Sequence, residues 1–263
     1  MKIAVLIAGE YREFAIAHKF WTFLSWPDVD CYFATWKHSL LVQVDTPLDD
    51  PLPPINEIIT AEQIRSLIKV VDLDITDRSE SAKMYYVGWS MIERWKSAIS
   101  LMQKSGTQYD RVILIRPDLA LSYDEDMFRQ FIRDIDDSLY SVNSVYHSIN
   151  DRMLLGTQDS ILKLMQLPMD ELSESSNPGI PSTVDIHPYL AKHCFPLYKK
   201  LLNIPILDTI VRTSCRTLIN PSFIECRDRE VEWWKVRLAP DARLKNLQTQ
   251  NKLKKLFLKD LKT

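Results

Sequence analysis

Strand-like and helix-like segments alternate along the first two thirds of the chain, and this alternation limits the fold more than any other feature. The first run, Lys2–Ala8, is apolar after its lysine and ends at Gly9, as is typical of a strand buried on both faces. Further strands are predicted at residues 30–35, 70–75, 112–115, 139–145 and 152–155. The pattern predicts a single α/β domain with a mostly parallel central sheet flanked by helices.

Helical periodicity is strongest between residues 81 and 104, where Met91, Trp95, Ala98 and Met102 recur at three- and four-residue steps. Thr60 and Gln63 have the spacing of a capping box, which predicts the start of a shorter helix. The predicted helices cover residues 14–24, 60–68, 81–104, 126–135, 158–167 and 187–202.

The domain is expected to cover residues 1–243, followed by a basic amphipathic helix at residues 244–263. Leucines and Phe257 would line one face of that helix, and five lysines the rest. Such a helix either lies on an anionic membrane surface or docks on the protein with its lysines in water. We therefore expect a cytoplasmic protein whose tail provides a peripheral membrane contact or a docked helix.

Composition excludes several functions. The net charge of −2 gives no general attraction to nucleic acid, so no nucleic-acid partner is expected. The five glycines lie far apart, which excludes a Walker loop and a G-x-G-x-x-G turn. Four scattered cysteines favour reduced thiols, and the five histidines lack the spacing of a zinc site.

Polar side chains gather where the predicted strands end, at the edge where α/β sheets bind ligands. Asp118 is the sharpest candidate, because it follows a buried strand directly. Its carboxylate has three possible roles. It could be a ligand for a divalent cation that neutralises a diphosphate, the partner of Arg116 in an ion pair, or a turn cap beside Pro117. The cations, carboxylates and aromatic side chains at the predicted strand ends together suit a phosphorylated ligand that carries a base.

Four sequence blocks resemble bacterial and viral GT-A glycosyltransferases of surface-polysaccharide biosynthesis. The blocks are "IAVLIAGEYREF", "DCYFATW", "MYYVGWSMIERWKSAISLMQKSGTQYDRVILIRPDLAL" and "INDRMLLGTQDSI", within residues 2–165. The resemblance implies a GT-A-like (Rossmann-like) fold and transfer of a sugar from a nucleotide-sugar donor to a glycan or other hydroxyl acceptor. The alternatives are a non-catalytic nucleotide- or sugar-binding relative and a peripheral membrane or assembly protein.

The resemblance also implies roles for individual residues. Donor-binding positions would be Gly9 and Arg12 at the diphosphate, Thr35 and Trp36 at the base and ribose, Tyr85 and Trp89 on the long helix, and Arg116 and Asp118. Acceptor-binding positions would be Asn150, Asp151, Asp185 and His187, and the catalytic pair would be Asp118 with Asp151 as base.

Asp118 would also hold Mn²⁺ or Mg²⁺ in place of a DxD motif. The run Arg116-Pro117-Asp118 offers one carboxylate where that motif has two, and an arginine can itself offset phosphate charge. The sequence therefore leaves open whether the cation is a metal, an arginine or both.

Overall fold

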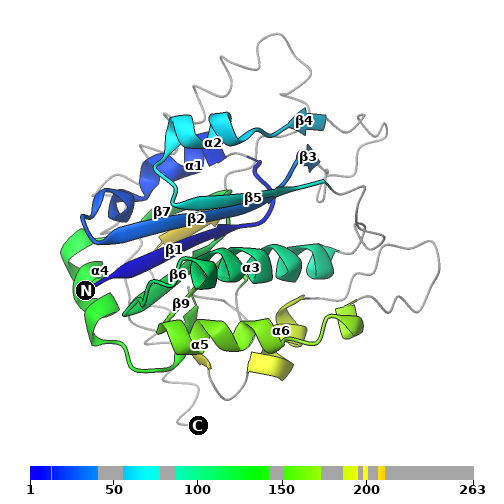
Figure 1. Cartoon of the computed structure of the whole chain (residues 1–263). Coiled ribbons are helices and arrows are strands. Elements are labelled where there is room, and N and C mark those ends of the chain that lie inside the picture. The colour runs from blue at the N-terminus through cyan, green and yellow to red at the C-terminus, as the bar shows by residue number, and fades with distance from the viewer. Residues whose placement is uncertain are drawn as a thin grey trace.

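A seven-stranded mixed sheet forms the centre of the computed structural model (Figure 1). The structure describes residues 1–12, 14–40, 56–77, 87–141, 151–172, 186–194, 198–200 and 207–210. The strands of the main sheet are β1 (Ile3–Ala8), β2 (Val29–Trp36), β5 (Asp72–Thr76), β6 (Arg111–Ile115), β8 (Leu139–Ser141), β9 (Met153–Gly156) and β10 (Tyr198–Lys200). Two small antiparallel pairs join β3 (His38–Leu40) to β4 (Asn56–Ile58) and β7 (Leu119–Ser122) to β11 (Leu207–Ile210).

The order of the strands across the main sheet is β10-β8-β9-β6-β1-β2-β5. All neighbouring strands run parallel except β9, which is antiparallel to both β6 and β8. The chain moves outward from β1 through β2 to β5 and then returns to place β6 on the other side of β1. The sheet therefore has a switch point between β1 and β6, and the predicted, mostly parallel α/β sheet is confirmed.

Two apolar cores cover the two faces of the sheet. In β1, Ile3, Val5 and Ile7 point into one core, while Ala4, Leu6 and Ala8 point into the other. This alternation explains the unbroken apolar run in the sequence, because both faces of the strand are buried. Figure 1 shows α1 and α2 on one side of the sheet and α3, α5 and α6 on the other.

The helices largely follow the predicted segments. They are α1 (Phe14–Ala17), α2 (Ala61–Leu67), α3 (Val87–Lys104), α4 (Glu125–Asp134), α5 (Gln158–Leu162) and α6 (Ile186–Cys194), with short 3₁₀ turns at His18–Phe20, Thr22–Ser25, Lys163–Gln166 and Asp170–Leu172. The capping box at Thr60 and Gln63 is confirmed, with both reciprocal hydrogen bonds present.

Two predicted helices are wrong in part. The segment at residues 14–24 is interrupted at Trp21, whose backbone leaves the helical region and whose indole Nε1 donates to the Leu119 carbonyl at 2.6 Å. The predicted helix at residues 187–202 ends at Cys194, and Tyr198–Lys200 forms β10 beside β8. Pairing with a neighbouring strand outweighs local helical preference at that edge.

The predicted tail at residues 244–263 lies outside the described residues, as does the proposed domain boundary before it. Within the described ranges, none of the helices has the length and hydropathy needed to cross a membrane.

Candidate functional site

The segments that follow β1 and β6 lie side by side at the switch point of the sheet. β1 and β6 are parallel neighbours, so their carboxyl ends share one edge. Gly9 follows β1 with a φ of 135°, a conformation that side-chain-bearing residues rarely adopt, and its N–H donates to Ala34 O at 3.1 Å. A Cβ built on Gly9 would lie 3.4 Å from Cδ of Pro117, which places the two segments in contact.

Four alternating charges form a connected network at this edge. Arg12 donates from Nη1 to Asp118 Oδ2 at 2.9 Å, and Arg116 donates from Nη2 to the same oxygen at 2.8 Å and from Nε to Oδ1 at 3.0 Å. Arg116 also donates from Nη1 to Asp151 Oδ2 at 3.2 Å. We call Arg12, Asp118, Arg116 and Asp151 the charge quartet. The predicted Arg116–Asp118 ion pair is confirmed, and it extends to a second arginine and a second carboxylate.

Asp151 belongs to the charge quartet because β9 is antiparallel to its neighbours β6 and β8. It stands just before β9, and the amino end of that antiparallel strand lies beside the carboxyl end of β6. The Arg116 N–H donates to the Arg152 carbonyl at 3.0 Å, which fixes the two segments together. Asp151, a site residue that the resemblance implied, therefore reaches this edge from the segment just before β9.

Arg12 has a strained backbone. Its φ of 36° makes it the one non-glycine residue with positive φ in the described part of the chain. Such conformations persist where the surrounding contacts enforce them, and they gather at functional sites. Here the contact to Asp118 holds the guanidinium in place across a sequence separation of 106 residues.

Burial and pairing act in opposite directions on the pKa values of Asp118 and Arg116. Burial by itself raises the pKa of Asp118, but the charges and hydrogen bonds of Arg116 and Arg12 hold that pKa below its ordinary value. Burial lowers the pKa of Arg116, but Asp118 and Asp151 raise it above its ordinary value. Asp118 and Arg116 are therefore charged at neutral pH.

The donor set does not fit a divalent metal ion. The side chain of Asp118 is only 2% exposed, and both of its oxygens accept hydrogen bonds from guanidinium groups. No group of three or more histidine, cysteine or acidic side chains in the described ranges is placed to hold a metal. A cation at Asp118 would have to displace two arginines.

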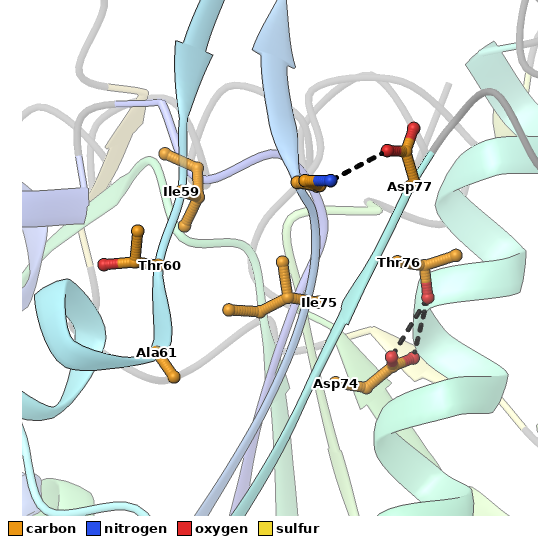
Figure 2. Close-up of a pocket in the computed structure, with 8 residues that line it drawn as sticks. Ile59, Thr60, Ala61, Asp74, Ile75, Thr76 and Asp77 are labelled. Atoms are coloured by element: carbon orange, nitrogen blue, oxygen red, sulfur yellow. Dashed lines mark hydrogen bonds and ion pairs between the residues drawn. The ribbon is translucent and has the colours of Figure 1, made fainter.

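A pocket of about 460 Å³ lies further along the same edge, at the carboxyl ends of β2 and β5. Figure 2 shows Ile59, Thr60 and Ala61 on one side of it and the segment from Asp74 to Asp77 on the other. At its rim, Lys37 Nζ lies 3.1 Å from Asp77 Oδ2. Most of the residues that line the pocket are polar or charged, and Ile59, Ala61 and Ile75 are its apolar members.

A buried arginine on α3 secures the strands that form this pocket. Arg94 is 3% exposed, lies 4.1 Å from the centre of the Trp36 ring, and donates from Nη1 to Asp74 at 3.0 Å and to Thr76 at 2.7 Å. Ser97 also donates to Asp74. These contacts join α3 to the carboxyl ends of β2 and β5.

The structure brings together only part of the predicted site. Thr35 and Trp36 are buried in the core, at 0% and 1% exposure, and Trp89 packs against the core on the α3 face. Tyr85, Asn150 and Asp185 lie outside the described residues, and for His187 only the helical backbone is described. Gly9, Arg12, Arg116, Asp118 and Asp151 are the predicted residues that meet at the switch point.

Sequence reasoning missed Arg94 and the pocket residues of β5. Arg94 falls three residues after Met91 and four before Ala98, on the apolar stripe of α3, and a charge at such a position signals a buried partner. Asp74 and Thr76 alternate with apolar neighbours, so their polar side chains share one face of β5.

Comparison with known proteins gives distant structural likenesses. No protein-family model matches the chain, and no curated protein does. The glycosyltransferase GlyE of Streptococcus pneumoniae TIGR4 is 14% identical with a TM-score of 0.42, over 76% of this chain and 45% of that one. HddC from Yersinia pseudotuberculosis is 11% identical with a TM-score of 0.37, over 76% of this chain and 90% of that one.

Mouse xyloside xylosyltransferase 1 is 11% identical with a TM-score of 0.35, over 65% of this chain and 73% of that one. This chain thus spans less than half the length of GlyE. Likenesses with TM-scores this low carry no conclusion about what this chain does.

Proposed function

We propose that this protein is a glycosyltransferase that moves a sugar from a nucleotide-sugar donor to a hydroxyl group of a glycan or other acceptor. The observation that carries the proposal is the position of Arg12 and Arg116 at the switch point of the sheet. Ligands of open α/β sheets bind at this point, outside the carboxyl ends of the strands. Guanidinium groups there suit the diphosphate of a nucleotide sugar.

The pocket at β2 and β5 supports the same proposal. Its strands β2 and β5 are the first and second neighbours of β1, so at the usual strand spacing it lies about 5 to 10 Å from β1 and about 5 Å further from β6. A nucleoside diphosphate is long enough to place its base against Ile59 and Ile75 while its phosphates reach the arginines. The volume of the pocket, about 460 Å³, also falls in the range of small-ligand sites.

In the proposed reaction the bond between the anomeric carbon and the diphosphate oxygen breaks, and its electron pair stays on that oxygen. Arg12 and Arg116 would stabilise the negative charge that develops there. The acceptor oxygen bonds to the anomeric carbon and gives up its proton. In an inverting reaction Asp151 would be the base that takes this proton.

A second candidate is a nucleotide-binding protein that performs no transfer. It is favoured by one observation: Asp118 and Asp151 both accept hydrogen bonds from Arg116, so carboxylate oxygens that a base would use already have a partner. Release of nucleoside diphosphate from nucleotide sugars separates the two candidates, since only a transferase turns the donor over.

Calorimetric titration with UDP, GDP, CDP and their sugars tests the proposed function. We expect at least one to bind. Replacing Ile75 in the pocket wall (Ile75→Phe) should weaken that binding about tenfold or more, because it fills the space proposed for the base. Val71→Phe is the matched control, since Val71 is 51% exposed and does not line the pocket. If none of the nucleotides binds the wild-type protein, the proposed function is wrong.

A further inference from the structure

We infer that the charge quartet is a metal-free diphosphate site, in which Asp118 positions two arginines instead of coordinating a cation. The inference deepens the proposed function and rests on it for the identity of the whole donor. The ligand class is an inorganic or nucleoside diphosphate. The groups that bind it are the guanidinium groups of Arg12 and Arg116.

Geometry provides the first support. Arg12 and Arg116 both donate to the same oxygen, Oδ2 of Asp118. Two like charges this close repel each other unless an anion lies between them, and Asp118 supplies that anion. The result is a pair of guanidinium groups side by side, which matches the several oxygens of a diphosphate better than one point charge does.

Donor capacity provides the second support. Arg116 has five N–H donors, and its contacts to Asp118 and Asp151 use three of them. Its side chain is 16% exposed, whereas that of Asp118 is 2% exposed. An approaching anion therefore meets guanidinium N–H groups first and the carboxylate behind them.

Charge balance provides the third support. A divalent cation held by two carboxylates has a formal charge of zero, and so do two arginines held by Asp118 and Asp151. The charge quartet therefore reproduces the electrostatics of a metal–dicarboxylate site with side chains alone. Arginine stays protonated across the physiological range, so the cation is always present.

Pyrophosphate binding in the presence of EDTA tests the inference separately from the proposed function. We expect the wild-type protein to bind pyrophosphate in EDTA. A second measurement omits EDTA, adds saturating Mn²⁺ and corrects for the complex that Mn²⁺ forms with pyrophosphate. The Kd of the wild-type protein for pyrophosphate should then change by less than about threefold. Arg116→Lys keeps the positive charge but loses the paired N–H donors of the guanidinium group. It should weaken pyrophosphate binding about 10- to 100-fold. Arg133→Gln, at an exposed position on α4, is the control and should bind like the wild type.

Asp118→Asn should also weaken pyrophosphate binding, and added Mn²⁺ should not restore it. Arg12→Lys provides a second variant if Asp118→Asn fails to fold. Absence of pyrophosphate binding in EDTA, or binding that appears only with Mn²⁺, overturns the inference. Binding of pyrophosphate without binding of any nucleoside diphosphate would retain the inference and refute the proposed function.

Discussion

Arg116 and Asp118 meet through two parallel hydrogen bonds, 3.0 Å from Nε to Oδ1 and 2.8 Å from Nη2 to Oδ2. The two residues flank Pro117 at the tip of β6, and the carboxylate is almost completely buried. Such a fork-to-fork pair holds both side chains in one orientation. Asp118 is thus part of the structure of the site as well as a candidate for its chemistry.

Loss of the Asp118 charge should destabilise the protein. Asp118→Asn leaves Arg12 and Arg116 partly buried without their shared anion, and breaking a buried ion pair costs about 3 kcal/mol or more. Urea denaturation followed by circular dichroism measures the free energy of unfolding. The control Asp134→Asn, at an exposed position on α4, should change it by less than about 0.5 kcal/mol. A variant as stable as the wild type would contradict the buried pairing.

The stability difference between the wild type and Asp118→Asn should depend on pH. The pKa of Asp118 is lower in the folded protein than its unfolded value of about 3.9. The stabilisation is therefore complete above pH 4 and is lost as the pH falls through the folded pKa. Urea titrations from pH 7 to pH 2.5 should give a constant difference down to about pH 4 and a smaller one below it. A difference that widens in acid would refute this assignment.

Replacement of Arg94 should weaken the contact between α3 and the pocket strands. Arg94→Met preserves much of the packing volume but removes the ion pair to Asp74 and the contact with the Trp36 ring. We expect a loss of about 2 kcal/mol in the free energy of unfolding, measured by urea denaturation. Arg65→Met, at an exposed position on α2, is the matched control. Equal effects of the two substitutions would argue against the role of Arg94.

Cys31 and Cys194 should resist alkylation in the folded protein. Burial raises the pKa of Cys31 to about 12 and that of Cys194 to about 11, so few thiolates form at pH 8. Iodoacetamide labelling followed by peptide mass spectrometry should show slow modification of both cysteines, and rapid modification after denaturation in urea. Rapid labelling of either cysteine in the native protein would show that its burial is transient.

Much of the local structure was predictable because it depends on neighbours in the chain. The capping box at Thr60 requires only Gln63 three residues later, and the apolar run of β1 follows from burial of both its faces. The break at Trp21 was not predictable in this way, since its indole is held by Leu119, 98 residues away.

The sequence by itself determined the α/β alternation, the glycine turn after β1 and the presence of Arg116 and Asp118 at the end of a buried strand. Only the tertiary structure decided what those two residues contact. Strand order placed β6 beside β1, and the reversed direction of β9 placed Asp151 at the same edge. The physical reason is that local patterns record which residues are buried, whereas the partner of a buried charge depends on which distant strands lie next to each other.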